Sequence, residues 1–421
     1  KEMIALWHAL ARNEVDVLIG TRSSIFAPLL NMGLIVIYDE NDPSHKEDQA
    51  PYYHSVTVAR FRSEIEGCDV IMSSVIPSAH TYLLIKNKAV GTVILSDRNE
   101  LAEIGFAGIN FQDKIDIMLE REIASALEKK EKIFIFHNRK GFATFIYCKR
   151  CKKALMCERC NSNLHYDFAG KQLFCPSCNY KAAMKEICPS CNASYVKFEG
   201  LGIEKLASNL KRIFPSANII AAKSILSLEK EANHYDVIIS TSKIPHLSDF
   251  KPEVSVIWNA DSLFNTGDYN AAENTYQLLA SFLQHTRRKL VICTGLQRNF
   301  YVYASLNKIN FHDFYESELK ERRELRLPPF FHCGLISMRG FDKKVVEKAS
   351  RKLYDSFKNK TRKGIQISDP SDSLRSRLRG KYYRYALIKS KNINTLNQTI
   401  RTLIKENRKS RIIITADIDP V

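Results

Sequence analysis

The stretch from residue 148 to residue 191 reads CKRCKKALMCERCNSNLHYDFAGKQLFCPSCNYKAAMKEICPSC. It holds eight of the 11 cysteines of the chain, arranged as four C-x-x-C pairs. Each pair places two thiolates on one tight turn, and tetrahedral zinc takes four such ligands, so the pattern predicts two zinc sites. The alternative is a disulfide cluster, which needs an oxidising compartment and would close strained short loops. The predicted ligands are Cys148, Cys151, Cys157, Cys160, Cys175, Cys178, Cys188 and Cys191.

The spacing alone leaves two ways of pairing these cysteines. Sequential pairing would join the first pair with the second and the third with the fourth, whereas nested pairing would join the second with the third and the first with the fourth. Residues 164–174 read as a hairpin with its turn at Gly170-Lys171, and a hairpin brings its ends together, which favours the nested arrangement. Four cysteines leave no open position for a reacting water, and so small a module needs metal to fold, so we expect the zinc to be structural.

Apolar runs on both sides of the cysteines alternate with helical segments, a pattern typical of βαβ units with a parallel sheet. Strands are expected at residues 15–19, 34–37, 70–72 and 90–95 before the cysteines, and at 133–136, 219–221, 237–239, 254–258 and 290–293 around and after them. The predicted fold class is therefore α/β, with two parallel-sheet lobes, of which the second carries the zinc module as an insertion.

A small α+β domain is predicted at the end of the chain. A charged helix over residues 311–326 stops before Pro328-Pro329, because two prolines cannot continue a helix. Beyond this boundary, residues 330–421 alternate between strand and helix, with strands expected at 334–338, 384–389 and 411–416.

The charge of the chain indicates the class of its partners. Lys and Arg total 63 against 46 Asp and Glu, a net charge of +17, which predicts nucleic acid or another anionic surface as a partner. The basic residues gather between Arg339 and Lys381, next to Tyr382, Tyr383 and Tyr385, and this mixture suits phosphate contact with base stacking. A solvated basic face is the alternative interpretation.

The sequence offers no sign of a membrane or secretion segment. No run approaches 18 consecutive apolar residues, and the N-terminus lacks the order of features of a signal peptide. Because the sequence starts at Lys1 and not at Met, we expect that it begins inside a longer gene.

The order of motifs along the chain resembles one family closely, the primosomal replication-restart helicases of bacteria, the primosomal protein N′ (PriA) family. The eight cysteines have the spacing of that family. The other matching segments are GTRSSIFAP (20–28), GLIVIYDE (33–40), YH (53–54), PS (77–78), NRKGF (138–142), GLGIE (200–204), ERREL (321–325), PPF (328–330), LRGKYYR (378–384) and DIDP (417–420).

The resemblance implies two RecA-like lobes, a module with two Zn²⁺ in the nested pairing, and a C-terminal domain that contacts DNA. It places the first lobe, truncated at its N-terminus, at 1–111, the second at 112–147 and 198–325, the zinc module at 148–197 and the C-terminal domain at 326–421. The implied activity is an ATP- and Mg²⁺-dependent 3′→5′ helicase that binds forked or single-stranded DNA and helps to reload the replicative helicase. Its implied partners are the single-strand-binding protein and primosome proteins, in the bacterial cytoplasm at the nucleoid. The implied DNA contacts are Arg22, Ser23, Lys46, Arg379 and Lys381.

The motifs of the motor depart from the pattern of the family. The chain has no G-x-x-x-x-G-K-[ST] segment, Tyr38 stands at the position of the Mg²⁺-binding Asp, and His285 replaces one arginine finger. Three candidate catalytic residues remain, namely Asp39, Glu40 and Arg288. We therefore predict that ATP hydrolysis is weakened or lost. The alternatives are an active helicase with variant motifs and a fragment without a role.

Overall fold

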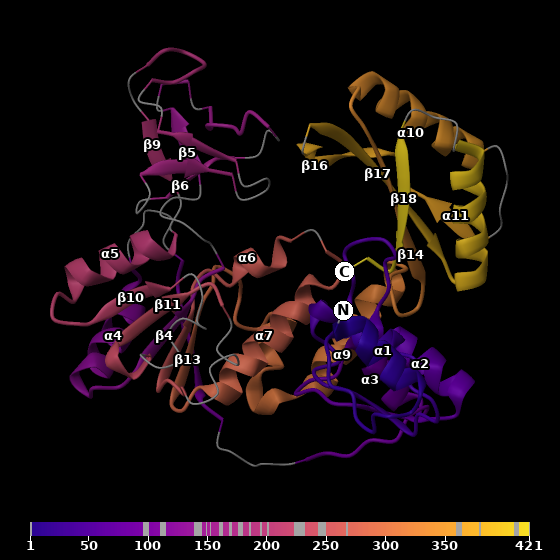
Figure 1. The fold of residues 1–421 in the computed structure, drawn as a ribbon. Helices are drawn as coiled ribbons and strands as arrows, with labels where there is room; N and C mark the ends of the chain where they lie inside the picture. Colours follow the sequence, from indigo (N-terminus) through magenta and orange to yellow (C-terminus); the bar gives the residue numbers. More distant parts are fainter. Residues whose placement is uncertain are drawn as a thin grey trace.

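The structure is a computed structural model, and it shows three regions around a central α/β lobe (Figure 1). It describes residues 2–95, 101–109, 115–138, 145–148, 150–151, 153–159, 163–167, 171–175, 180–184, 187–193, 196–199, 202–222, 232–242, 250–266, 268–358, 364–378, 380–407 and 412–420. Among the helices of these ranges, none combines the length and the apolar character that crossing a bilayer requires.

The central lobe is built on a six-stranded parallel sheet with the order β10-β11-β4-β12-β13-β3. Its strands are β10 (Ile219–Ala222), β11 (Val237–Ser240), β4 (Ile133–Phe136), β12 (Val254–Ile257), β13 (Lys289–Cys293) and β3 (Glu103–Ala107). The strands are apolar runs because helices cover both faces of the sheet. In β4, Ile133 and Ile135 pack with α4 (Ile117–Glu128) and α5 (Ile203–Ile213), while Phe134 and Phe136 pack on the other face.

Four helices pack on the other face of this sheet, the face of Phe134 and Phe136. They are α6 (Asp261–Phe264), α7 (Ala271–His285), α8 (Tyr301–Ala304) and α9 (Phe311–Glu324). Aromatic side chains fill this layer, and the rings of Tyr276 and Phe314 lie parallel with centroids 4.0 Å apart. The strands expected in this lobe are confirmed. The sheet also takes in β3 at its edge, a segment in the range that the resemblance gives to the first lobe.

The first lobe contains a parallel pair of strands, β1 (Leu34–Ile37) and β2 (Asp69–Met72). Three helices belong to this part, α1 (Glu2–Ala11), α2 (Ser55–Glu66) and α3 (Ala79–Lys86). The strands predicted at 15–19 and 90–95 are wrong, because these segments find no strand partner among the described residues and stay in solvent. Ile19 is 92% exposed and Leu95 is 91% exposed. That both lobes are RecA-like stays a prediction.

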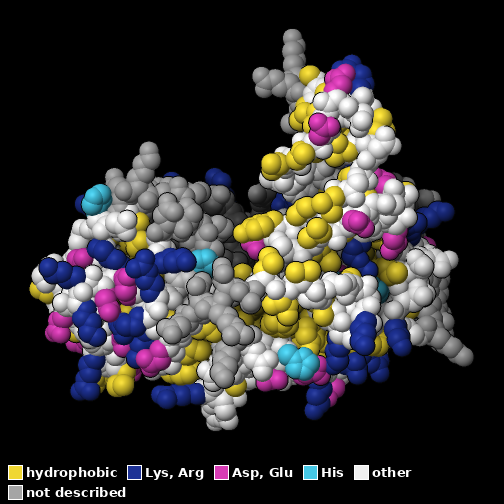
Figure 2. Space-filling view, turned by 90° about the horizontal axis from the view of Figure 1, so that it is seen from below, with side chains coloured by type: hydrophobic (Ala, Val, Ile, Leu, Met, Phe, Trp, Pro, Cys, Tyr) yellow, Lys and Arg dark blue, Asp and Glu magenta, His cyan; other side chains and the backbone are white. Residues whose placement is uncertain are grey.

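Hydrophobic side chains lie on the surface of this first lobe. Alternate residues of β1 face opposite ways, so Ile35 and Ile37 are buried while Leu34 and Val36 are exposed. Figure 2 shows hydrophobic side chains gathered near the middle of the face seen from below, whereas charged side chains of both signs are interspersed over the lobe at its left.

The cysteine module follows β4 and returns to α5, as the insertion pattern predicted. An antiparallel pair, β5 (Phe145–Cys148) with β9 (Val196–Glu199), joins the two ends of the module. The module also contains a three-stranded antiparallel sheet of β6 (His165–Asp167), β7 (Gln172–Phe174) and β8 (Lys181–Ala183). The pairing of β6 with β7 confirms the predicted hairpin.

The C-terminal domain is an antiparallel sheet with two helices on one face (Figure 1). Its strands are β14 (His332–Gly340), β15 (Ile365–Ile367), β16 (Ser371–Leu378), β17 (Lys381–Ser390) and β18 (Ile413–Ile418), and its helices are α10 (Lys343–Lys358) and α11 (Ile393–Asn407). This confirms the predicted α+β character. Alternate residues of the central strands, such as Ile336 and Ile388, form the core beneath the helices.

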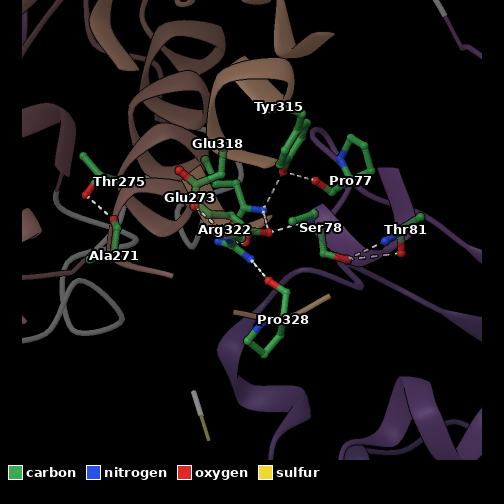
Figure 3. A network of polar contacts seen from close by, with 12 residues as sticks. Pro77, Ser78, Thr81, Ala271, Glu273, Thr275, Tyr315, Glu318, Arg322 and Pro328 are labelled. Atoms are coloured by element: carbon green, nitrogen blue, oxygen red, sulfur yellow. Dashed lines mark hydrogen bonds and ion pairs between the residues drawn. The ribbon is translucent and has the colours of Figure 1, made fainter. Parts of the chain in front are cut away.

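A buried arginine joins the helices at the centre of the molecule (Figure 3). Arg322 on α9 donates from Nε to Glu318 and from Nη2 to Glu273 on α7, each at 2.7 Å. Its third contact is the carbonyl oxygen of Pro328, and the ring of Tyr269 lies beneath the guanidinium. The side chain of Arg322 is only 5% exposed, and its two carboxylate partners hold its pKa above the usual value despite the burial.

The same network also forms hydrogen bonds with the segment of the first lobe at the start of α3. The backbone N–H of Ala79, at the start of α3, donates to Glu273 at 2.7 Å, and the hydroxyl of Tyr315 donates to the carbonyl oxygen of Pro77. Tyr82 stacks on Tyr315 with ring centroids 4.7 Å apart. The segment before α3 is therefore fixed by side chains of α7 and α9.

Replacing Arg322 tests this junction. Arg322→Met leaves two carboxylates buried without a counter-charge, so we expect a loss of about 3–5 kcal/mol of unfolding free energy. The matched control is Arg323→Met, because Arg323 is exposed and its guanidinium lies over the ring of Phe330, and we expect it to cost less than about 1 kcal/mol. Thermal unfolding followed by circular dichroism measures both. Adding Glu273→Gln and Glu318→Gln to Arg322→Met should restore part of the loss, and equal midpoints for the two Met variants would contradict the assignment.

Candidate functional site

Four cysteines from the two ends of the module come together where β5 ends. The Sγ atoms of Cys148, Cys151, Cys188 and Cys191 lie within 4.8 Å of one another. The distance from Cys148 to Cys191 is 3.5 Å, and that from Cys151 to Cys188 is 3.7 Å. A tetrahedron with Zn–S bonds of 2.3 Å has sulfur–sulfur distances of about 3.8 Å. The four residues therefore fit a zinc ion, and they are the outer set of the nested pairing.

The local backbone explains why these turns present thiolates. In both C-x-x-C turns, the N–H of the first cysteine donates to a carbonyl oxygen five residues later, from Cys148 to Lys153 and from Cys188 to Ala193, each at 2.9 Å. Amide groups inside the turns point at sulfur, and the N–H of Ser190 lies 3.4 Å from the Sγ of Cys188. Such donors, chiefly the amide of Cys151, lower the pKa of Cys148 to about 6, which favours the thiolate that zinc binds.

The second predicted set is described only in part. Cys157 and Cys175 are buried in the small core of the module, while Cys160 and Cys178 lie outside the described residues. The turn at Cys175 repeats the local pattern, because its N–H donates to the carbonyl oxygen of Tyr180 at 2.8 Å. A second zinc site at these four cysteines stays a prediction.

Glu40, one of the candidate catalytic acids, is buried at the start of α3. Its carboxylate accepts hydrogen bonds from the backbone N–H of Ser78 at 2.5 Å and from the hydroxyl of Ser78 at 2.9 Å. Ser78 is the N-cap residue of α3, so the hydrogen bonds to Glu40 fix the residue at which that helix begins. Glu40 is only 3% exposed, and this burial raises the pKa of its carboxyl group. In this arrangement both carboxylate oxygens are engaged within the protein.

The other two candidate catalytic residues lie in different surroundings. Asp39 follows β1 with a φ of 47°, and its carbonyl oxygen accepts from the N–H of Asp42. Arg288 precedes β13, and its guanidinium donates to Glu122 at 2.8 Å and to Glu131 at 2.7 Å. Ligands of open α/β sheets bind at the carboxyl ends of the strands, whereas Arg288 stands at the amino end of its strand. The structure thus gives Arg288 two carboxylate partners within its own lobe.

The predicted DNA contacts of the first lobe have partners in the protein. Arg22, in a 3-10 helix at Arg22–Phe26, donates from Nε and Nη2 to Glu47 at 3.0 and 2.9 Å, while Ser23 is exposed. Lys46 is 6% exposed, and its Nζ lies 2.8 Å from Asp417 and 2.8 Å from the carbonyl oxygen of Ile418. A phosphate at Lys46 would have to displace this ion pair with the C-terminal domain.

The predicted contacts of the C-terminal domain lie at the turn between β16 and β17. Lys381 is the first residue of β17, and its Nζ lies 5.1 Å from the centroid of the exposed ring of Phe341. Arg379 lies outside the described residues. Lys381 therefore presents its amine near an exposed aromatic ring.

Sequence reasoning did not predict the buried network around Arg322. The motif ERREL with PPF carries the signal, because Arg322 of this motif pairs with Glu273 and Glu318, and Arg323 lies 4.5 Å from the ring centroid of Phe330. Two adjacent arginines in a charged helix look like a solvated face. Only the partner on α7, 49 positions earlier in the chain, distinguishes the buried arginine from its neighbour.

A family model and several curated proteins that are similar to this chain carry related names. The family model described as "Primosomal protein N C-terminal domain" matches residues 323–421. Three proteins named "Replication restart protein PriA" are similar over nearly the whole chain. That of Bacillus subtilis is 24% identical over 98% of this chain and 55% of its own length, that of Thermotoga maritima 27% over 97% and 56%, and that of Rickettsia prowazekii 29% over 94% and 64%.

The chain spans about half the length of the first two of these relatives. Among solved structures, "De novo designed protein Foldit4" matches 22% of this chain with 10% identity and a TM-score of 0.19, which is too low to bear on the fold.

Zinc content tests the cysteine site. We expect the purified chain to hold about two zinc ions and Cys148→Ser to hold about one, because one lost thiolate opens an all-cysteine site. The control is Cys68→Ala, since Cys68 is buried in the first lobe away from the module. Inductively coupled plasma mass spectrometry on the same samples gives the metal-to-protein ratio. A wild-type chain without zinc, or a Cys148→Ser variant with unchanged zinc, would contradict the site.

The raised pKa of Glu40 predicts a pH dependence of stability. The folded chain holds this proton more tightly than the unfolded chain, whose reference pKa is 4.5. The folded state therefore gains stability as the pH falls from neutrality through the raised pKa, and the gain ends below the unfolded pKa. Glu40→Gln lacks this titration, so wild type should gain in melting temperature relative to Glu40→Gln between pH 7 and pH 5. The exposed control Glu64→Gln should follow wild type, and a pH-independent difference for Glu40→Gln would exclude the effect.

Proposed function

Because the chain belongs to the family of replication restart protein PriA, we propose that it is a DNA-binding protein of primosomal replication restart. In this role it binds forked or single-stranded DNA in the bacterial cytoplasm and helps to reload the replicative helicase. The observation that carries the proposal is the similarity to proteins of that name along 94–98% of the chain, from the first lobe to the C-terminal family domain.

Each region has a part in the proposed function. Zinc in the module supplies folding energy, and no open coordination position remains for chemistry. The C-terminal domain supplies basic and aromatic side chains for DNA, with Lys381 and Arg379 as contacts, while Arg22 and Ser23 contribute from the first lobe. The single-strand-binding protein and primosome proteins are the proposed protein partners.

We further propose that ATP hydrolysis is weakened or lost. Support comes from Glu40, whose carboxylate is engaged at the cap of α3, and from Arg288, whose guanidinium pairs with two glutamates of its own lobe. A catalytic acid must be able to reach Mg²⁺ or water, and an arginine finger must reach the γ-phosphate. In their present contacts these side chains serve stability.

A salt series of DNA binding tests the DNA role. Fluorescence anisotropy with labelled forked, single-stranded and duplex DNA should show affinity that falls steeply as the salt concentration rises, because counterions are released from phosphates. Lys381→Gln should reduce the slope of log K against log salt by about 1, and the exposed lysine of the second lobe in Lys129→Gln should leave it unchanged. Failure of the chain to bind any of the three DNAs would overturn the proposal.

A coupled phosphate-release assay tests the motor. We expect turnover of the wild-type chain with DNA to equal that of Glu40→Gln, within the background of the assay. DNA-stimulated turnover above the Glu40→Gln background would favour an active ATP-dependent 3′→5′ helicase and would overturn the loss of hydrolysis. Such a result would leave the DNA-binding role intact.

A further inference from the structure

Among the described residues, no helix covers one of the two faces of the C-terminal sheet. Side chains alternate along β14 and β17, and those facing α10 and α11 form the core. The opposite side chains are half-buried, and Figure 1 shows that this face turns away from α10 and α11. This open face consists of Leu335, Ser337 and Arg339 on β14, Phe341 directly after it, and Lys381, Tyr383, Tyr385 and Leu387 on β17.

The two ends of the open face differ. At one end Lys389 donates to the carbonyl oxygen of Leu325 at 3.1 Å, and Asp417, which lies opposite Leu335, pairs with Lys46. This end is docked on the lobes. At the other end Phe341 is 76% exposed and Ile413 is 45% exposed, so the surface there is free.

Two tyrosine rings lie next to each other on the free end of the open face. Tyr383 and Tyr385 are two residues apart on β17, with ring centroids 6.4 Å apart and planes inclined by 26°. Arg339 lies directly opposite Tyr383 in the register, and Ser337 lies opposite Tyr385. Together with Phe341 these rings offer flat surfaces beside a guanidinium group.

Within the described residues, no carboxylate neutralises the charge of Arg339. Its side chain makes no hydrogen bond or ion pair there, and its Nε is buried without an acceptor. The acids closest along these strands are engaged, since Asp372 pairs with Arg384 at 3.2 Å and Asp342 accepts from the N–H of Lys344. The side chain of Arg339 as a whole is only partly buried, so a phosphate oxygen from outside can supply an acceptor to its guanidinium group.

We propose that the free end of this sheet is a binding site for single-stranded nucleic acid. Bases stack on Tyr383 and Tyr385, and Arg339 and Lys381 bind phosphate oxygens. A single strand fits better than a duplex, because only unpaired bases can expose their faces to side chains. This inference rests on the proposed DNA-binding function and deepens it by naming the surface and the form of DNA.

Substitution of the tyrosines tests the site with a labelled oligo-dT strand and the full 421-residue chain. Tyr383→Leu and Tyr385→Leu should each weaken binding about 5- to 150-fold, the range found for loss of one base–aromatic stack. Tyr383→Phe and Tyr385→Phe should bind as wild type, because the ring is kept. The matched control is Tyr382→Leu on the opposite face of the same strand, which should leave binding unchanged. Zinc content and melting temperature confirm that each variant is folded.

Photo-crosslinking locates the strand independently. An oligonucleotide with 5-iodouracil bases should cross-link to Tyr383 or Tyr385, as identified by mass spectrometry of the peptides. If the wild-type chain binds DNA but the Leu variants bind oligo-dT equally well, or the cross-links map only to the lobes, the site is overturned while the DNA role stands. Phe variants as weak as Leu variants would also overturn stacking. A wild-type chain that binds neither oligo-dT nor forked DNA would overturn the proposed function itself.

Discussion

The pairing of Arg322 with Glu273 and Glu318 is the constraint on which the assembly of the lobes depends. A guanidinium at 5% exposure is stable only when carboxylates surround it, and both carboxylates come from helices on one face of the central sheet. Glu273 serves twice, since its other oxygen accepts from the N–H of Ala79 in the first lobe. The spacing of α7 and α9 and the position of α3 are therefore set by one buried charge.

This buried network is relevant to the proposed loss of ATP hydrolysis. The segment before α3 is held from one side by Glu40 and from the other by Glu273 and Tyr315. A movement of the first lobe against the second, as closure on nucleotide requires, would break hydrogen bonds to buried carboxylates, which cost more to lose than exposed ones. The acid expected to serve hydrolysis is part of this clamp. The contacts that stabilise the junction therefore also restrict the movement of Glu40, the candidate catalytic acid.

The apolar runs predicted the central sheet well, because strands buried on both faces are continuous apolar segments, as in β4, β11 and β12. The same reasoning failed at 15–19 and 90–95, where apolar runs find no partner strand among the described residues. The cysteine turns were predictable because each pair is local. The partners of charged residues could not be predicted in this way. Lys46 pairs with Asp417, near the far end of the chain, and no local sequence pattern indicates such a pair.

The pairing of charges distinguishes the proposed DNA-binding end of the C-terminal sheet from the candidate catalytic residues in the lobes. In the lobes, Arg22, Lys46 and Arg288 are matched with carboxylates, so much of their field is cancelled locally. Arg339 has no such partner in the described chain and stands near the free end of β14. Nine residues of extended strand place that end about 27 Å from the end docked on the lobes. Changes at the candidate catalytic residues therefore need not disturb the free end, so the proposed binding of a single strand there is compatible with the proposed loss of hydrolysis.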